Sequence, residues 1–378
     1  MSELDTLLAE LVSIDSVNPD LVPGARGEGE IADFVAGWLR ARGLDVHREE
    51  TARAGRPNVV AVARGIGGGK VLMLNAHMDT VGVAGMTDPF RPVVRQGRLY
   101  GRGAMDTKAA LAAFMMATAG AVKRGLRGDI ILTAVADEEY ASAGTEAIVR
   151  KWKADAAIVG EPSGLEIVTT HKGFAWFEIE TAGIAAHGSL PGVGVDAIAK
   201  MGKVLTAVDA MAADLKRLPG HAALGPGSIH ASLIQGGQEL SSYPASCRVG
   251  IERRTIPGET PDDVEVQLKR MLVSIGAQDP DFKATLKRIF ARDPMEAAKD
   301  APIVTALARS VRSVTGSEPA FAGMSGWLDS ALLSAAGIPT VVIGPRGAGL
   351  HGIDEWVDLA SVTACCEIID ATIEEFCR

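Results

Sequence analysis

The 378-residue sequence lacks the marks of several large protein classes. It has no run of Lys or Arg and a formal net charge of −9, a pattern that argues against nucleic-acid binding. No stretch stays apolar for the roughly 18 residues that a membrane-spanning helix needs, so we expect no membrane partner. The opening Met1-Ser2-Glu3-Leu4-Asp5 is acidic and amphipathic, without the basic and apolar regions of a signal peptide. We therefore expect a cytoplasmic protein.

Cysteine is scarce as well. The four cysteines form no C-x-x-C pair and lie late in the chain. This pattern predicts reduced, packed thiols and argues against a disulfide framework or a zinc knuckle. The cysteines are Cys247, Cys365, Cys366 and Cys377.

The composition that is present is that of a globular protein with a substantial core. Hydrophobic residues make up 47% of the chain and charged residues 22%. The length exceeds that of one ordinary domain and suits two.

The first part of the chain alternates helix and strand patterns. Two stretches carry apolar residues at helical spacing, and a third, rich in Ala and Met, indicates a buried helix. Four short runs are nearly all apolar, as strands buried on both faces tend to be. This alternation predicts an α/β fold with a central, mostly parallel sheet and helices on both faces. The helices are expected at Glu3–Ile14, Glu28–Leu39 and Lys108–Val122, and the strands at Asn58–Ala63, Val71–Asn75, Ile130–Ala136 and Ala156–Gly160.

After about Lys172 the pattern changes to strands that alternate apolar and polar residues, with two amphipathic helices between them. The order β-α-β-β-α-β predicts a small α+β domain. The α/β pattern returns after about Phe290, so this domain is inserted into the first. We expect boundaries at 1–172, 173–288 and 289–378. The expected strands are Phe174–Glu180, Ser228–Ile234, Arg248–Arg254 and, after the insertion, Pro339–Ile343; the helices are Val195–Leu215, Pro261–Ile275 and Pro302–Val314.

His77 and Asp79 follow the apolar run Val71–Asn75, at the strand end where open α/β sheets place ligand sites. In extended chain the i, i+2 spacing puts both side chains on one face. A metal-bound His commonly donates its other ring N–H to a carboxylate. On its own the pair is a weak signal, and a surface loop remains the alternative.

Asp106 lies just before the expected buried helix, in Gly101-Arg102-Gly103-Ala104-Met105-Asp106-Thr107-Lys108. Its carboxylate can cap the helix. It can equally bridge two metals, because each oxygen can hold one ion.

Three adjacent acids, Asp137, Glu138 and Glu139, end the apolar run Ile130–Ala136. They repel one another unless cations or hydrogen bonds compensate, and a solvated acidic turn is the alternative. Adjacent side chains on extended chain point apart. Glu138 and Glu139 therefore differ in role: one can bind metal while the other addresses a metal-held water.

Glu161, in Gly160-Glu161-Pro162-Ser163, ends the next apolar strand, and His351 follows the late strand and a Gly-rich loop. Five candidate metal ligands thus lie just past predicted strands, a coincidence that is hard to assign to chance. They are His77, Asp106, Glu139, Glu161 and His351.

Taken in order, these motifs resemble the M20 metallopeptidase family, which includes acetylornithine deacetylase, succinyl-diaminopimelate desuccinylase, aminoacylase and glutamate carboxypeptidase. The resemblance extends over essentially the whole chain, inserted domain included. The matching segments are His77-x-Asp79, Gly101-Arg102-Gly103-x-x-Asp106-x-Lys108, Glu138-Glu139, Gly160-Glu161-Pro162-Ser163 and His351.

The resemblance implies two divalent ions per subunit, zinc by family likeness, with cobalt or manganese also suited to these ligands. His77 and Glu161 would hold one ion, Glu139 and His351 the other, with Asp106 bridging. Asp79 would orient His77. Glu138 would be the general base and acid, so that a metal-bridged hydroxide attacks the amide carbonyl and the leaving amine receives a proton.

By the same resemblance, the inserted domain is a dimerisation domain and the protein a homodimer. His187 matches the family's Gly-x-x-x-His segment, in which the His reaches the partner subunit's site and stabilises the oxyanion. Arg254 resembles the Arg that binds the substrate carboxylate. Relatives carry Asn-x-x-Pro thirteen residues before that Arg, and here Ser241 stands in place of the Asn. A structural loop His and a surface strand Arg remain the alternatives.

The expected function is a metal-dependent amidohydrolase acting on a small N-acyl-L-amino acid. A carboxypeptidase or dipeptidase acting on short peptides is the alternative, and a non-catalytic binding protein on this fold is the remote one. A carbamoyl-amino-acid amidohydrolase is disfavoured, because that branch usually has His where Glu161 stands. Asp329 is expected to brace a loop of the site.

Overall fold

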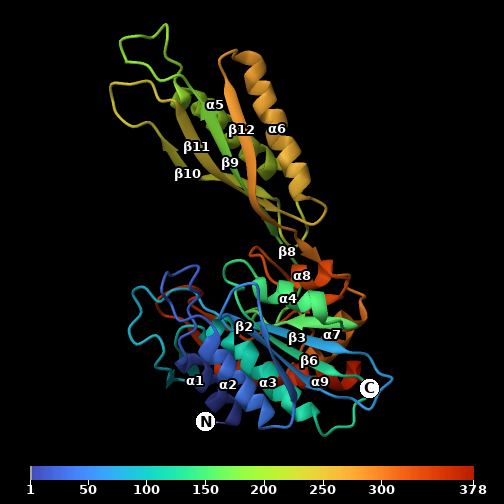
Figure 1. Ribbon diagram of the computed structural model, residues 1–378. Coiled ribbons are helices and arrows are strands. Elements are labelled where there is room, and N and C mark those ends of the chain that lie inside the picture. Colours follow the sequence, from blue (N-terminus) through green and yellow to red (C-terminus); the bar gives the residue numbers. More distant parts are fainter. Residues whose placement is uncertain (1) are drawn as a thin grey trace. The chain divides into compact units, whose positions relative to one another are not determined.

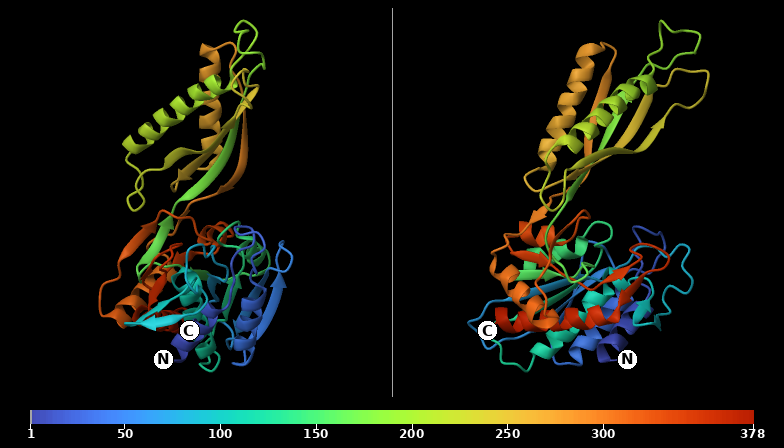
Figure 2. Two further views of the ribbon diagram at one scale, coloured as in Figure 1. Left: turned by 90° about the vertical axis from the view of Figure 1, so that its left-hand side faces the viewer. Right: turned by 180° about the vertical axis from the view of Figure 1, so that it is seen from behind.

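The computed structural model describes residues 2–378, which divide into two compact units. Among the described residues, unit 1 comprises 2–169, Ala297–Ala322 and Leu328–Arg378, and unit 2 comprises Thr170–Glu296 and Gly323–Trp327. Figure 1 and Figure 2 show each unit with its own sheet and helices. None of the helices in residues 2–378 combines the length and the apolarity that a membrane crossing requires.

The helices and strands of unit 1 follow the alternating pattern of the sequence. The short segment η1 covers Ala104–Lys108, and within it Asp106 and Thr107 have non-helical backbone angles. The helices are α1 (Glu3–Ser13), α2 (Gly29–Arg40), α3 (Ala109–Ala121), α4 (Ala143–Lys151), α7 (Pro302–Thr315), α8 (Ser330–Ala335) and α9 (Leu359–Phe376), and the strands are β1 (Asp45–Glu50), β2 (Pro57–Ala63), β3 (Leu72–His77), β4 (Val93–Arg95), β5 (Arg98–Tyr100), β6 (Ile130–Val135), β7 (Ala156–Val159), β15 (Thr340–Val342), β16 (Gly347–Ala348) and β17 (Trp356–Asp358). The boundary between the units falls inside β8 (Ile167–His171) and β14 (Phe321–Met324).

The central sheet has the order β1-β2-β6-β3-β7-β15-β8, and its middle strands β6, β3, β7 and β15 run parallel. Outer strands β1, β2 and β8 pair antiparallel. Residues of α1, α2, α3, α7 and α9 share one core with the sheet, and Figure 1 shows α4 and α8 on its opposite face. The predicted α/β class, with a mostly parallel central sheet between helices, is confirmed.

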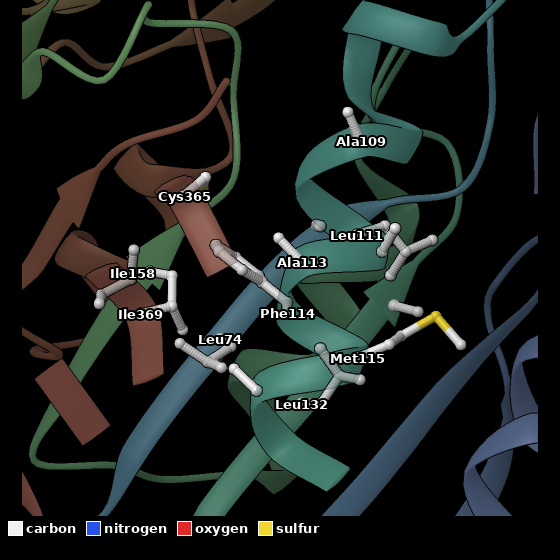
Figure 3. Close-up of a cluster of buried hydrophobic side chains, with 14 of the residues drawn as sticks. Leu74, Ala109, Leu111, Ala113, Phe114, Met115, Leu132, Ile158, Cys365 and Ile369 are labelled. Atoms are coloured by element: carbon white, nitrogen blue, oxygen red, sulfur yellow. The ribbon is translucent and has the colours of Figure 1, made fainter. Parts of the chain in front are cut away.

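Helix α3 is buried on nearly every side, and its Ala-rich sequence permits this because small side chains let the helix lie close to its neighbours. Phe114 packs between sheet residues such as Leu74 and Leu132 and the α9 residue Ile369 (Figure 3). Truncating such a buried Phe to Ala costs about 3–5 kcal/mol of stability. The helix therefore gives a rigid support to the Asp106 loop at its N-terminal end.

A small separate sheet in unit 1, of order β16-β17-β5-β4, joins distant parts of the chain. β17 pairs antiparallel with β5, with Trp356 opposite Tyr100 and Val357 opposite Leu99. This pairing brings the loop between β16 and β17, which carries His351, beside the segment that follows β5 and carries Asp106.

Unit 2 forms an antiparallel sheet of order β10-β11-β9-β12. Inward residues such as Phe177, Ile179, Val249 and Ile251 alternate along β9 and β11 and pack in one core with residues of the two helices. The chain order is β-α-β-β-α-β, with strands β9 (Gly173–Ala182), β10 (Ser228–Gly236), β11 (Ser246–Thr255) and β12 (Lys283–Arg292) and helices α5 (Ala197–Arg217) and α6 (Pro261–Gln278).

Unit 2 extends past the boundary expected at 288/289. After β12, the short strand β13 (Met295–Glu296) pairs with residues 170 and 171. The segment 323–327 also belongs to this unit, where the indole N–H of Trp327 donates to the carbonyl oxygen of Asp293 at 3.0 Å. A two-residue strand and a single tryptophan leave no periodic signal in the sequence.

Candidate metal centre and active site

Three neighbouring parallel strands place the candidate groups of the site at one edge of the central sheet. His77, the last residue of β3, lies opposite Val135 at the end of β6, and Asn75 lies opposite Val159 at the end of β7. The chain beyond β6 therefore brings Glu138 and Glu139, and the chain beyond β7 brings Glu161, to the side of His77. This is the carboxyl edge at which open α/β sheets bind ligands.

Asp106 and His351 arrive on loops that need special backbone conformations. Gly103, three residues before Asp106, has φ +79°, and a Cβ there would meet Thr80 Cγ2 at 2.7 Å. Gly349 has φ +82°, and a Cβ there would meet the backbone of Asp354 at 2.8 Å. Glycine suits both positions because it adopts positive φ without steric cost.

Asp106 lies between two imidazoles, with one carboxylate oxygen facing each. Its Oδ1 is 3.1 Å from His77 Nε2, and its Oδ2 is 3.2 Å from His351 Nε2. Each imidazole also faces a second acid: Glu161 Oε1 is 3.8 Å from His77 Nε2, and Glu139 Oε2 is 3.3 Å from His351 Nε2. The structure thus brings all five predicted ligands together.

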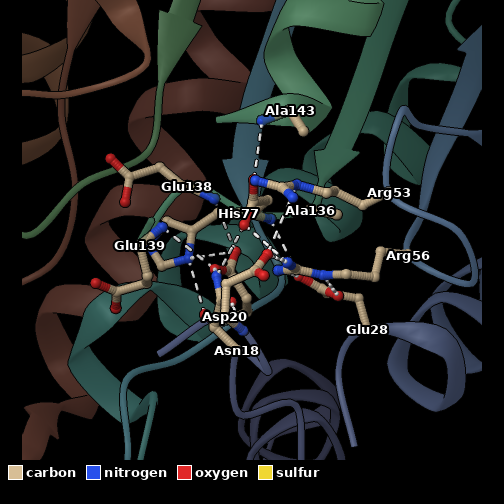
Figure 4. Close-up of polar contacts among 12 residues, drawn as sticks. Asn18, Asp20, Glu28, Arg53, Arg56, His77, Ala136, Glu138, Glu139 and Ala143 are labelled. Carbon is tan, nitrogen blue, oxygen red and sulfur yellow. Dashed lines mark hydrogen bonds and ion pairs between the residues drawn. The ribbon is translucent and has the colours of Figure 1, made fainter. Parts of the chain in front are cut away.

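Two groups of side chains could each hold a metal ion, because the ligand atoms within each group all lie within 4.8 Å of one another. One contains His77, Asp106 and Glu139, and the other contains His77, Glu138 and Glu161. Glu138, the expected proton-transfer group, therefore also lies within reach of an ion. In Figure 4 the carboxylates of Glu138 and Glu139 lie apart, so the two acids address different points of the site.

The cluster holds more buried acid than its imidazoles balance. Burial and the neighbouring Asp106 raise the pKa of Glu139 to about 7, despite its hydrogen bond to His351. Burial and neighbouring acids raise the pKa of Glu138 and Glu161 well above the usual range. Hydrogen bonds to Asp106 and Glu139 raise the pKa of His351 to about 10. Such an arrangement is stabilised by positive charge placed among the carboxylates.

Asp79, the residue expected to orient His77, faces the His77 ring with both its backbone and its side chain. His77 Nδ1 is 2.9 Å from the backbone carbonyl oxygen of Asp79 and 3.7 Å from its Oδ1. The backbone of Asp79, and not its carboxylate, is thus the nearer partner of the ring. The carboxylate instead accepts from the backbone N–H groups of Glu138 (3.1 Å) and Glu139 (3.2 Å).

A buried ionic network, centred on Arg56, lies behind these acids and was not predicted from the sequence (Figure 4). Arg56 is 5% exposed, and it donates from Nε and Nη2 to both oxygens of Glu28 at 2.7 and 2.6 Å. Its Nη1 is 2.8 Å from Asp137 Oδ1, and Asn18 Nδ2 donates to both Asp137 and Asp79. Asp137 was visible as part of the acid run. Arg56 and Glu28 gave no signal, because their partners are remote in sequence.

Three further candidates, His187, Ser241 and Arg254, belong to unit 2. His187 is exposed, with Nδ1 2.8 Å from Ser189 Oγ. The N–H of Gly188 donates to the carbonyl oxygen of Ser241 at 2.7 Å, so His187 and Ser241 lie on adjoining loops. Arg254 is the penultimate residue of β11, with Nε 3.2 Å from Glu252 Oε1 and its guanidinium 5.4 Å from the Phe174 ring.

Asp329, expected to brace a loop, is fully buried and accepts a hydrogen bond from Thr145 Oγ1 at 2.5 Å. Burial raises its pKa to about 6. The contact joins the start of α8 to the start of α4, which follows the acid run.

Comparisons with known proteins agree over nearly the whole chain. Acetylornithine deacetylase of Myxococcus xanthus is 28% identical over 99% of this chain and 97% of its own length. Succinyl-diaminopimelate desuccinylase of Sulfurovum sp. is 28% identical over 98% of both. The crystal structure of a tripeptidase from Staphylococcus aureus matches with a TM-score of 0.81 at 22% identity, over 99% of this chain and 98% of that one, which shows a shared fold. The model of Peptidase family M20/M25/M40 matches residues 73–375, and this chain, a hydrolase, belongs to that family.

Proposed function

We propose that this enzyme hydrolyses the amide bond of a small N-acyl-L-amino acid with a free α-carboxylate, using two divalent metal ions. One observation carries the proposal: the two oxygens of buried Asp106 face the Nε2 atoms of His77 and His351 at 3.1 and 3.2 Å. A further acid stands beside each imidazole. Two relatives that align over nearly full length are named for removing acetyl and succinyl groups.

The residues present fit a pair of divalent ions. Oε1 of Glu139 is buried and has no hydrogen-bond partner among residues 2–378, so it is available to a cation. His77, Asp106 and Glu161 would hold one ion, and Asp106, Glu139 and His351 the other. Imidazole with carboxylate suits zinc, and cobalt or manganese also accept these ligands. When bound, the ions supply Lewis acidity that polarises a carbonyl and makes water more acidic.

Glu138 would move the proton. Its backbone is fixed by Asp79 and its carboxylate lies within 4.8 Å of ligand atoms of His77 and Glu161. A carboxylate there can take a proton from the attacking water and give it to the leaving amine. Glu139, one residue later, is directed to His351 and so would serve as a ligand.

Substrate recognition would come from unit 2. The Nε of Arg254 faces Glu252, and the guanidinium has further N–H donors on its two Nη atoms. A planar guanidinium group suits the two oxygens of an α-carboxylate. His187 is exposed and would reach the partner subunit's site, where its Nε2 can donate to the oxyanion. Ser241, which replaces the usual Asn, would offer one hydroxyl donor.

The proposed enzyme is a homodimer in the cytoplasm. β10 is an edge strand of its sheet, and its Leu233 and Ile234 are 76% and 57% exposed. An apolar edge strand of this kind is a ready surface for pairing with a second copy. Cys365 and Cys377 are buried free thiols, and their burial raises the pKa of each, which suits a reducing compartment.

A substrate screen tests this proposal. The metal-stripped protein is incubated with zinc, cobalt or manganese and offered N-acetyl, N-succinyl and N-formyl amino acids, dipeptides, and the same acyl compounds as α-amides. The proposal predicts turnover of at least one acyl amino acid, more than of its α-amide. Faster turnover of dipeptides would favour the alternative of a carboxypeptidase or dipeptidase. No metal-dependent turnover at all would contradict the proposal.

A further inference from the structure

Glu355 is a buried acid that the proposed catalytic roles leave unused. It is 1% exposed and lies in the loop between β16 and β17, four residues after His351. Oε1 accepts from the backbone N–H groups of Met105 and Asp106, at 2.8 and 3.1 Å. Oε2 accepts from the backbone N–H of Gly103 at 3.0 Å and from Arg102 Nη1 at 2.7 Å.

These four donors occupy the carboxylate of Glu355 fully. An ionised carboxylate offers about four acceptor positions, so none is left for a metal ion or a substrate. Glu355 therefore acts on the site through the backbone that carries Asp106.

Arg102 extends the same contact to the loop of His351. It is 2% exposed, and its Nη2 donates to the carbonyl oxygen of Gly352 at 2.9 Å, while Nε donates to that of Gly82 at 3.1 Å. Gly352 follows His351 directly. The Glu355–Arg102 pair thus contacts both loops whose side chains meet at Asp106 Oδ2 and His351 Nε2.

His77 is held by other means. Its Nδ1 lies 2.9 Å from the carbonyl oxygen of Asp79, a contact that involves neither Glu355 nor Arg102. The Glu355–Arg102 pair therefore affects the position of Asp106 relative to His351 more than it affects the position of His77.

We infer that Glu355, with Arg102, is a positioning residue that sets the separation of Asp106 from His351 and thereby the affinity for the ion held by His351 and Glu139. This inference rests on the proposed pair of metal ions. It predicts that one substitution at Glu355 lowers the affinity for one ion more than the affinity for the other.

Glu355→Gln tests the inference, because it keeps the shape and presents an NH₂ group where backbone N–H donors need an acceptor. The metal-stripped enzyme is titrated with Co²⁺, with calorimetry for affinity and visible absorption for coordination. We expect one ion to bind about 10- to 100-fold more weakly, the range for loss of a partner that orients a ligand. The other ion should change much less, and the absorption of the weakened site should shift.

Two further variants complete the test. Arg102→Lys keeps the charge but cannot bond Glu355, Gly352 and Gly82 together, so it should weaken the same ion. Asp129→Asn is the matched control: Asp129 also accepts from a backbone N–H (Gly65, 2.8 Å) and an Arg (Arg64 Nη1, 3.0 Å), at the opposite end of β6. It should bind both ions as the wild type does. Circular dichroism identifies folded variants.

Unchanged affinities and spectra in folded Glu355→Gln would overturn the inference. The inference would also be overturned if Glu355→Gln and the Asp129→Asn control both bound the two ions more weakly and to the same extent. That result would indicate general destabilisation. If Glu355→Gln does not fold, Arg102→Lys decides by the same criteria. If the wild type binds fewer than two ions, the proposed metal pair itself is overturned. If the variants bind two ions as tightly as the wild type does, only the positioning role of Glu355 is overturned.

Discussion

The carboxylate of Asp79 fixes the backbone of Glu138: Oδ1 accepts the Glu138 N–H at 3.1 Å, while Oδ2 accepts the next N–H, that of Glu139, at 3.2 Å. One fully buried carboxylate thus holds two successive acids in a defined turn, and Asn18 Nδ2 holds that carboxylate in turn at 2.8 Å. The direction of each acid depends on this contact.

The first prediction concerns Asp79. Asp79→Asn keeps the volume but replaces one acceptor by an NH₂ group, so the turn should shift. We expect a loss of about 10- to 100-fold in activity or metal affinity, as for other partners that orient ligands. Steady-state kinetics and metal titration measure it. Asp155→Asn is the control, because Asp155 accepts the N–H of Val71 (2.7 Å) at the far end of β7; equal effects in both variants would contradict the role.

Glu138 should transfer protons without being needed for metal binding. Glu138→Ala is expected to lower kcat by at least about 100-fold, the lower end for general acid–base catalysis, at normal metal content. Glu139→Ala, the matched variant, should lose metal instead. Near-normal turnover in Glu138→Ala would rule out the role, and loss of metal there would mean that the two acids exchange roles.

Arg254 should recognise the substrate carboxylate. A charge-assisted hydrogen bond is worth about 1.5–3 kcal/mol, so Arg254→Ala should lower kcat/KM for the acid about 10- to 100-fold and affect the α-amide much less. Arg248→Ala is the control, because Arg248 lies on the same strand and pairs with Glu180 at 3.2 Å. Equal losses of Arg254→Ala on acid and amide would refute the assignment.

The active site should be shared between two subunits. If His187 serves the partner's site and Glu138 its own, His187→Ala and Glu138→Ala homodimers should each be nearly inactive. A mixed dimer of the two variants then has one complete site. Purified by two different tags, it should recover up to half of the wild-type activity. A mixed dimer as inactive as its parents would place His187 at its own subunit's site or in a structural role only.

The strand ends and the clustering of the candidate metal ligands could be predicted from sequence because both follow local rules. Apolar runs such as Ile130–Ala136 mark buried strands, and acids directly after them, such as Glu138 and Glu161, stand out against the pattern. Glu355 could not be found this way. Its partners Arg102 and Asp106 are about 250 residues away in the chain. In the sequence, the adjacent acids Asp354 and Glu355 are typical of a solvated loop.

The orientation of His77 shows a second limit. An i, i+2 spacing predicts that the His77 and Asp79 side chains share a face, but β3 ends at His77, two residues before Asp79. The ring therefore meets the backbone carbonyl of Asp79, and the carboxylate is free to hold the next strand's acids. Such a change of partner depends on backbone geometry beyond the strand, which residue spacing does not encode.

The central claim is that Asp106 bridges two divalent ions. The most direct measurement is the number of zinc ions bound per subunit, by calorimetric titration of metal-stripped protein, in the wild type and in Asp106→Ala. The account predicts two tightly bound ions in the wild type. In Asp106→Ala the affinity for both ions should fall. The fall should exceed the roughly 10- to 100-fold loss that follows removal of a partner that orients a ligand. Two ions bound by Asp106→Ala as tightly as by the wild type would contradict the account.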